Sequence, residues 1–380
     1  MRRERIRGLL LNLLLSVLVT LVVLGIAELG TRILLGDSFA MLPRYHTAGH
    51  YGEFTLRRTK PGSEYWHTTS DGRWRFSINN QGFRDDHDYS LQKLPEVVRV
   101  LVLGDSITHG YEMNQEEIYP KIIERSLIRA GTATEVLNTG VSGYSTAEEL
   151  LFLENEGVRY DPDVVVLGIF GNDFDDNVRT GLFGLEDGRL VVRKTEYIPG
   201  VAIMDLVNAV PPLRWLSENS RLYSFGMNVV WDAAKSRLLA AETAGAHREQ
   251  VLPSGQLDAY QKELMLALLR RMDEFCRSRG IWLVLVDLAL PDDTDGHTYR
   301  SSIPSDITDA VANLGDAYIS AEQVLGTYDG LTRFHVPRGH RHMNEIGHLL
   351  YGTAISNAIR ELPLRGVPLV SGQILAAPEH

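Results

Sequence analysis

Residues 97–103 form an almost purely apolar run that ends in Gly104-Asp105-Ser106, and this junction constrains the fold most strongly. The run predicts a strand buried on both faces, as in a parallel sheet. Gly104 permits a sharp turn that a side chain would obstruct, and we expect Asp105 to hold that turn by hydrogen bonds. Open α/β sheets bind ligands at the carboxyl ends of their strands. The Ser106 hydroxyl is therefore predicted to lie at a ligand-binding edge.

Strand and helix patterns alternate through the rest of the chain. The other strands of this pattern are expected at 135–138, 164–167 and 281–286. The helices are expected near 116–130, 146–157, 255–279 and 344–361. Repeated β-α-β units of this kind predict a parallel sheet with helices on both faces.

Residues 9–26 carry no charge and are long enough to cross a membrane. As a helix they would span roughly 27 Å, close to the hydrocarbon thickness of a bilayer. The net charge of the chain is −11; four arginines and one glutamate before the run give +3, so the remainder carries −14. This asymmetry predicts a single-pass anchor with a cytoplasmic N-terminus and the rest of the chain outside the cytoplasm. A cleaved signal peptide is the alternative, but the run is long and no clear cleavage site follows it.

Small and polar residues recur every four positions along that helix, at Gly8, Asn12, Ser16 and Thr20. Membrane helices use such faces to pack against each other, so the stripe permits self-association. The alternative is that the hydroxyl groups bond to their own helix backbone.

The composition excludes several classes of protein. Hydrophobic residues make up 44% of the 380, enough for a substantial core. The acidic net charge and the lack of a basic stripe argue against a nucleic-acid partner. Cys276 is the only cysteine, so no intrachain disulfide or multi-thiolate metal site can form, and we expect it to be buried on a helix.

Four parts are predicted along the chain: the basic end and anchor at 1–27, a connector at 28–95, a main domain at 96–362 and a tail at 363–380. The connector is polar and turn-rich but contains aromatic residues, so we expect it to pack on the main domain. A helical insertion at about 178–254 interrupts the alternation. It could be a lid or an acyl-binding wall, or an ordinary insertion with a small core of its own.

Two loops at the expected carboxyl edge contain further candidate residues. Gly143 lies after the second strand, and a glycine there lets a backbone N–H approach a substrate oxygen. Phe170-Gly171-Asn172-Asp173 follows the third strand, and an asparagine amide can donate to a developing oxyanion. One such donor contributes roughly 3 kcal/mol in acyl transfer.

His342 precedes the last predicted helix and could act as the base for Ser106. The sequence argues against a metal in its place. The acidic positions 173–177 fail the spacing of a helix-loop-helix calcium site. The histidines near position 342 lack the spacing of a zinc site; they are His335, His340 and His348. We expect no metal and no cofactor.

The order Gly-Asp-Ser, Gly, Gly-Asn-Asp and His-x-Asn-x-x-Gly resembles the four blocks of the SGNH hydrolase superfamily, also called GDSL esterases and lipases. The resemblance implies a three-layer α/β/α sandwich with a flavodoxin-like parallel sheet, in addition to the N-terminal transmembrane helix. It also implies Ser106 as nucleophile and His342 as base. The implied oxyanion hole consists of the Ser106 and Gly143 backbone N–H groups and the Asn172 amide. Residues 79–84 resemble a segment found before the first block in membrane-anchored relatives.

The chain departs from the family pattern at two places. Phe170 replaces the usual first glycine of the third block. The acid that orients the histidine is missing, because the expected positions hold Gly339 and His340. A backbone carbonyl could orient the ring, or a carboxylate from elsewhere, with Asp329 the nearest upstream candidate. Otherwise the chain is a weak or inactive enzyme.

The sequence therefore predicts a serine ester hydrolase that forms an acyl-enzyme at Ser106. A small-molecule, lipid or acylated-glycan ester would serve as substrate. An O-acyltransferase that modifies envelope polysaccharide would use the same nucleophile. A non-catalytic carbohydrate- or lipid-binding module of the same fold is the third alternative.

Overall fold

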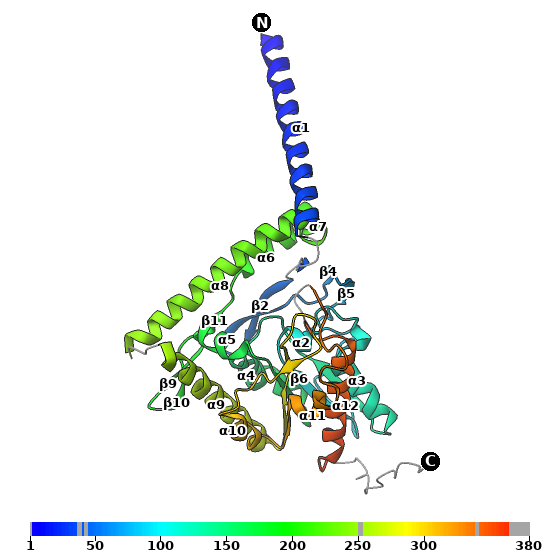
Figure 1. Ribbon diagram of the computed structural model, residues 1–380, viewed down its shortest axis with the longest axis vertical. Helices are drawn as coiled ribbons and strands as arrows, with labels where there is room; N and C mark the ends of the chain where they lie inside the picture. The colour runs from blue at the N-terminus through cyan, green and yellow to red at the C-terminus, as the bar shows by residue number, and fades with distance from the viewer. Residues whose placement is uncertain (1, 36–39, 42–44, 250–253, 339–341, 365–380) are drawn as a thin grey trace.

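The computed structural model describes residues 2–35, 40–41, 45–249, 254–338 and 342–364. A long helix, α1 (Arg2–Leu34), projects from one end of the folded part of the chain (Figure 1). The segment Arg5–Leu34 is apolar enough to cross a membrane by length and composition, and none of its most apolar part is buried against the protein. A signal sequence passes the same test. Along the predicted small-residue stripe, Thr20 Oγ1 donates to Ser16 O at 2.8 Å, as expected of hydroxyl groups bonded to their own helix.

A five-stranded, wholly parallel sheet forms the centre of the domain, in the order β15-β12-β8-β6-β7. The strands are β6 (Val98–Leu103), β7 (Thr134–Asn138), β8 (Val164–Ile169), β12 (Trp282–Asp287) and β15 (Ala317–Ile319). Numbered along the chain, this order is 2-1-3-4-5, that of flavodoxin-like folds. The switch point, where ligands bind in such sheets, lies between β6 and β8.

Helices cover both faces of this sheet, which gives the predicted three-layer sandwich. Alternate residues of β6 pack on opposite sides, because successive side chains of a strand point to opposite faces. Val100 and Val102 belong to one apolar core, and Leu101 and Leu103 belong to the other. The first core is shared with α3 (Tyr119–Arg129) and α12 (Glu345–Glu361), and the second with α4 (Thr146–Asn155), α5 (Asp173–Thr180) and α9 (Ser254–Arg279). Cys276 is fully buried on α9, as predicted.

The predicted connector is more regular than its composition suggests. It contains β1 (Ala40–Met41), β2 (His46–Tyr51), β3 (Phe54–Thr59), β4 (Glu64–Thr69) and β5 (Arg73–Ser77). These strands form two small sheets, β1-β4-β5 and β3-β2, and β11 (Glu196–Tyr197) of the insertion extends the second. Tyr45, Tyr65, Phe76, Ile78 and Tyr111 make a separate apolar cluster that joins the first sheet to the loop after Ser106.

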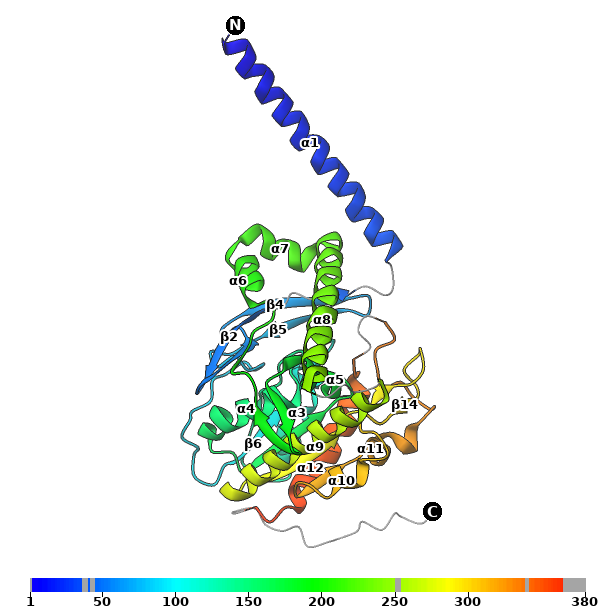
Figure 2. The same cartoon turned by 90° about the vertical axis from the view of Figure 1, so that its left-hand side faces the viewer.

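The insertion was predicted to be helical, but it also contains strands. It begins with a hairpin, β9 (Phe183–Glu186) and β10 (Arg189–Val192), and then β11 (Glu196–Tyr197) pairs with β3 of the N-terminal segment. Three helices follow: α6 (Val201–Ala209), α7 (Pro211–Asn219) and α8 (Arg221–Glu249). α6, α7 and the start of α8 lie at the end of the domain from which α1 leaves, and α8 runs from there along the side of the domain toward α5 (Figure 2).

Short elements complete the described chain. They are α2 (Ser106–His109), η2 (Gln115–Glu117), η3 (Gly157–Tyr160), β13 (Leu290–Pro291), β14 (Tyr299–Arg300), α10 (Thr308–Ala312), α11 (Ala321–Leu325) and η4 (Gly326–Tyr328). The predicted C-terminal tail lies outside the described residues from position 365 onward.

Candidate functional site

Ser106 is the first residue of α2, directly beyond the carboxyl end of β6 at the switch point. Gly104 makes the turn with φ of +154°, and a Cβ there would lie 1.9 Å from Thr108 Oγ1, so only glycine fits. Asp105 caps α2, because its Oδ1 accepts the Ile107 N–H at 2.9 Å. The prediction that Asp105 holds the turn is confirmed. Ser106 remains partly exposed while its neighbours on both sides are buried.

The His342 ring lies between a hydroxyl and a carboxylate. Its Nε2 is 3.0 Å from Ser106 Oγ, although 236 positions separate the two residues. Its Nδ1 is 3.2 Å from Glu112 Oε2, and the same oxygen accepts the His342 backbone N–H at 3.2 Å. The Glu112 side chain is fully buried, and the His342 side chain is 13% exposed. A carboxylate on Nδ1 stabilises the tautomer that leaves Nε2 free to accept a proton.

Glu112 therefore makes the contact with Nδ1 of His342 that the missing acid would have made. Asp329, the upstream candidate, is exposed at the end of η4. Gly339 and His340 lie outside the described residues. Gly110 is the one signal in the sequence that could have indicated Glu112. With its left-handed φ of +82° it ends α2 after a single turn, so the chain returns toward Ser106 and brings Glu112 close to it.

Arg84 fixes the backbone of the loop that carries Glu112. Its guanidinium donates to the carbonyl groups of His109 and Gly110, and to that of Met113 at 2.6 Å. The side chain is completely buried and packs over the Phe76 ring at 3.7 Å. Three charge-assisted bonds hold the loop while Glu112 itself has a left-handed φ of +63°. Arg84 belongs to the predicted 79–84 segment, which therefore contributes to the site by holding the loop that carries Glu112.

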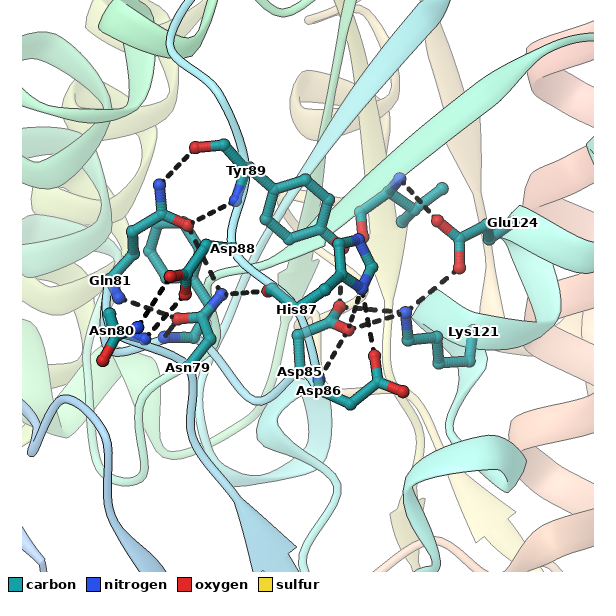
Figure 3. Close-up of polar contacts among 12 residues, drawn as sticks. Asn79, Asn80, Gln81, Asp85, Asp86, His87, Asp88, Tyr89, Lys121 and Glu124 are labelled. Atoms are coloured by element: carbon teal, nitrogen blue, oxygen red, sulfur yellow. Dashed lines mark hydrogen bonds and ion pairs between the residues drawn. The ribbon is translucent and has the colours of Figure 1, made fainter.

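The 79–89 loop is itself held by a dense polar network (Figure 3). Asn79 Oδ1 accepts the N–H groups of Gln81 and Phe83, and Asn80 bonds to Asp88 through both backbone and side chain. Lys121 of α3 lies between Asp85, at 2.9 Å, and Glu124, at 3.1 Å. This network attaches the 79–89 loop, which carries Arg84, to α3 of the central domain.

Gly143 and Asn172 lie in the loops that follow β7 and β8, at the same sheet edge as Ser106. Gly143 has a φ of +77° and is partly exposed, and its carbonyl accepts a bond from the buried Arg57 guanidinium of β3. The Asn172 amide donates to Asp176 Oδ2 at 3.1 Å. Asn172 and the Ser106 backbone N–H also hydrogen-bond to Asp105, which lowers the pKa of that carboxyl against the larger effect of burial. Two of the three predicted oxyanion donors thus contact Asp105.

Four buried carboxyl groups surround these loops. Burial raises the pKa of Asp105, and it raises those of Glu149 and Asp173 well above their usual range, with repulsion between neighbouring carboxylates adding to the effect. Neither carboxyl oxygen of Glu149 has a hydrogen-bond partner among the described residues. A neutral carboxyl group is far cheaper to bury than a charged one, so burial favours the protonated forms of Glu149 and Asp173.

The fourth carboxyl group, that of Glu148, gives a testable pH dependence. Burial raises its pKa to about 7, despite Arg57 nearby. Because the pKa of Glu148 in the folded state lies above the unfolded value of 4.5, the protonated side chain contributes its full stability below pH 4.5. This contribution is lost as the pH rises through 7. The free energy of unfolding of Glu148→Gln, relative to that of wild type, should therefore be higher at pH 8 than at pH 5, by at most about 3 kcal/mol.

Denaturant unfolding at both pH values measures this gain. Glu117→Gln is the matched control, because Glu117 lies exposed on η2. A gain for Glu148→Gln that is equal at the two pH values, or larger at pH 5, would contradict the assignment.

The other histidines of the region are bonded within the fold. Burial lowers the pKa of His109 and of His348 to about 3, so both are neutral. His348 Nδ1 accepts the Tyr119 N–H at 3.1 Å, and His335 Nε2 lies 3.1 Å from Ala289 O. His340 lies outside the described residues. These contacts leave His342 as the described histidine that faces Ser106.

One group of described residues has the donor atoms for a cation, namely Asp85, Asp86 and His87, whose ligand atoms lie within 4.8 Å of one another. The Lys121 ammonium, however, is 2.9 Å from Asp85 Oδ2 and supplies the compensating positive charge (Figure 3). The donor set therefore fits an internal ion pair better than a metal.

The chain is an α/β protein with a parallel sheet, and a serine, a histidine and a carboxylate lie in contact at the switch point of that sheet. The chain is matched over residues 102–349, more than half of its length, by the GDSL-like lipase/acylhydrolase family. It belongs to that family, and the fold is that of SGNH hydrolases.

Individual relatives are distant. An arylesterase of Vibrio mimicus is 33% identical over 75 residues, which is 20% of this chain and 38% of that protein's length. The acetyl xylan esterase AlAXEase is 14% identical, with a TM-score of 0.37, over 69% of this chain and all of that one. A lipase/acylhydrolase from Enterococcus faecalis is 16% identical, with a TM-score of 0.36, over 69% of this chain and 95% of that one.

Proposed function

We propose that this protein is a membrane-anchored serine ester hydrolase whose catalytic domain lies outside the cytoplasm. The observation that carries the proposal is the Ser106–His342–Glu112 chain of contacts, at 3.0 and 3.2 Å. Family membership supports an ester-hydrolysing enzyme. The apolar α1 and the arginines before its apolar run support the anchor and its orientation.

In the proposed mechanism, Ser106 Oγ attacks the ester carbonyl while His342 Nε2 takes its proton. Glu112 holds the ring through Nδ1 and stabilises the imidazolium that forms. His342 then returns the proton to the leaving alcohol, and an acyl-enzyme remains on Ser106. Water, deprotonated by His342, hydrolyses the acyl-enzyme and releases the acid.

The Gly143 N–H, the Ser106 N–H and the Asn172 amide would stabilise the negative charge of the tetrahedral intermediate. This role requires Asn172 to exchange its contact with Asp105 or Asp176 for the oxyanion. Arg57, bonded to the Gly143 carbonyl, keeps that loop in place and adds positive charge close to it.

Glu112 also bears on the alternative of a non-catalytic binding module. The argument for that alternative was the missing acid before His342. A buried carboxylate in contact with Nδ1 removes the argument. No contact of the described residues favours acyl transfer to a sugar over hydrolysis.

Covalent labelling tests the proposal. A fluorophosphonate probe should attach to Ser106 of the full-length protein in detergent, as located by peptide mass spectrometry. The Ser106→Ala protein should not be labelled, while Ser142→Ala, which removes a neighbouring partly exposed hydroxyl, should label as wild type does. Equal labelling of wild type and Ser106→Ala would refute the assignment.

Small and lipid-like esters differ in the length of the acyl group. Hydrolysis of a p-nitrophenyl ester series from acetate to palmitate by the wild-type protein measures the preference between them. We expect released acid without any sugar acceptor, and a strict requirement for an acceptor would favour the transferase.

A further inference from the structure

The final turns of α1 are joined to the helical insertion by side-chain contacts. Glu28 accepts hydrogen bonds from Ser220 Oγ at 2.8 Å and from the backbone N–H groups of Arg221 and Leu222 at 3.0 Å each. Arg32 donates to Asn219 O at 3.1 Å. The first N–H groups of a helix lack partners within it, so Glu28 caps the start of α8. The anchor is therefore fixed to the α7–α8 junction rather than tethered loosely to it.

This joint sets the height of the insertion above the membrane. The uncharged run of α1 ends at Ile26, two residues before Glu28. At 1.5 Å per residue, the capping carboxylate lies on the order of 3 Å along the axis from the end of that run. If the run fills the hydrocarbon layer, the α7–α8 junction lies at the layer's boundary.

The insertion carries an unusual share of exposed apolar side chains. Outside α1, the described residues include fourteen exposed large apolar side chains, and six of them lie on α6, α7 and α8. These six form what we call the insertion face: Ile203, Leu206, Trp215, Phe225, Val229 and Val230. Their exposed fractions range from 43% for Phe225 to 62% for Trp215. α6, α7 and the first turns of α8, where Phe225, Val229 and Val230 lie, are at the end of the domain from which α1 leaves (Figures 1 and 2).

An apolar groove lies between α6 and α8, next to two of these residues. It has a volume of about 590 Å³, and Ile203 and Val230 of the insertion face contribute to its lining, together with Met204, Met227 and Trp231. Exposed arginines flank the joint: Arg32 is 51% exposed and Arg214 is 48% exposed at the side chain. Apolar and aromatic groups bordered by arginine are the composition that helices at a lipid headgroup region require.

We propose that the insertion face lies on the lipid bilayer that α1 crosses, with its apolar side chains at the boundary between headgroups and acyl chains. This inference rests on the membrane anchoring in the proposed function but not on ester hydrolysis. The insertion is then a second membrane contact that fixes the orientation of the domain, in contrast to a lid that closes over Ser106.

Fluorescent labels on the full-length protein test the placement. Cys276 is buried and is the only cysteine, so Cys276→Ser provides the background for single cysteines. L206C and V229C, each labelled with NBD, report on the insertion face in phosphatidylcholine–phosphatidylglycerol nanodiscs. We expect blue-shifted emission and at least a twofold loss of intensity when doxyl-labelled lipid is included.

Two matched positions make the result decisive. Leu349 is 53% exposed on α12, away from α1, and L349C should show water-like emission without quenching. Val17 lies in the apolar run, and V17C should be quenched. Quenching at 17 with water-like emission at 206 and 229 would overturn the proposal and leave the anchor intact. Blue-shifted emission at 206 and 229 without quenching by doxyl lipid would instead indicate a protein partner and also overturn it.

No quenching at 17 would remove the anchor and the insertion-face proposal together. Ester hydrolysis, measured on the same samples, is a separate readout. Its presence or absence tests the site at Ser106 and does not depend on where the labels lie.

Discussion

Replacing Glu112 by glutamine should lower kcat/KM for ester hydrolysis by about four orders of magnitude. The amide has the shape of the carboxylate, but its NH₂ group can donate to Nδ1 of His342. That bond would stabilise the tautomer with the proton on Nε2, which cannot accept the Ser106 proton. Because Glu112 acts through His342, most of the loss should appear in kcat, with KM changed only a few-fold.

Several measurements separate this role from a structural one. Asp329→Asn should retain full activity, since Asp329 is exposed and the contact with Nδ1 is made by Glu112. Glu112→Asp, a shorter carboxylate, should recover part of the rate. Nitrogen-15 NMR of the imidazole should show the proton moving from Nδ1 to Nε2 in Glu112→Gln. Unchanged turnover in Glu112→Gln would show that the ring is oriented by another group.

Asn172→Ala should lower kcat by a factor of about 10²–10³, equivalent to roughly 3 kcal/mol of transition-state stabilisation. KM should stay within a few-fold, because the amide is expected to bond strongly only to the oxyanion of the tetrahedral intermediate. Steady-state kinetics on p-nitrophenyl acetate measure both parameters.

Asn172 also precedes α5 and bonds to Asp176, so its loss could destabilise that helix. Thr180→Ala is the matched control, since it removes the bond from Thr180 Oγ1 to Asn177 O at the other end of α5. We expect Thr180→Ala to lower the melting temperature with little change in kcat. Equal losses of kcat in the two variants would assign the effect to α5 rather than to oxyanion binding.

The central fold could be predicted from sequence because its signals are local and repeated. The runs that became β6, β8 and β12 are apolar on both faces, which few structures other than a parallel sheet accommodate. The expected ends lie within two or three residues of those observed. The short strand β15 was missed because its three residues, Ala317–Ile319, carry no distinct pattern.

The candidate site was predictable only where residue type and strand position coincide. Ser106, Gly143 and Asn172 each lie within five residues after the end of a parallel strand, so the topology brings them to one edge. Glu112 has no such marker, because its position depends on the one-turn length of α2 and on a loop clamped by a remote arginine. Arg84 and Arg57 come from a segment whose polar, turn-rich composition resembles a linker.

The loops of the candidate site depend on Arg57 and Arg84 of the N-terminal segment, and this decides how a detergent-free form of the enzyme can be made. Trimming the gene at residue 96, where the predicted main domain begins, would remove Arg57 and Arg84, whose guanidinium groups hold the loops at 143 and 109–113. Cutting between α1 and β1 would keep both and lose only the anchor and its cap on α8. The shorter fragment also lacks Tyr51, Phe54, Leu56, Phe83 and Tyr89 of the main apolar core, so it should be unstable. The longer one should retain its full turnover in aqueous buffer.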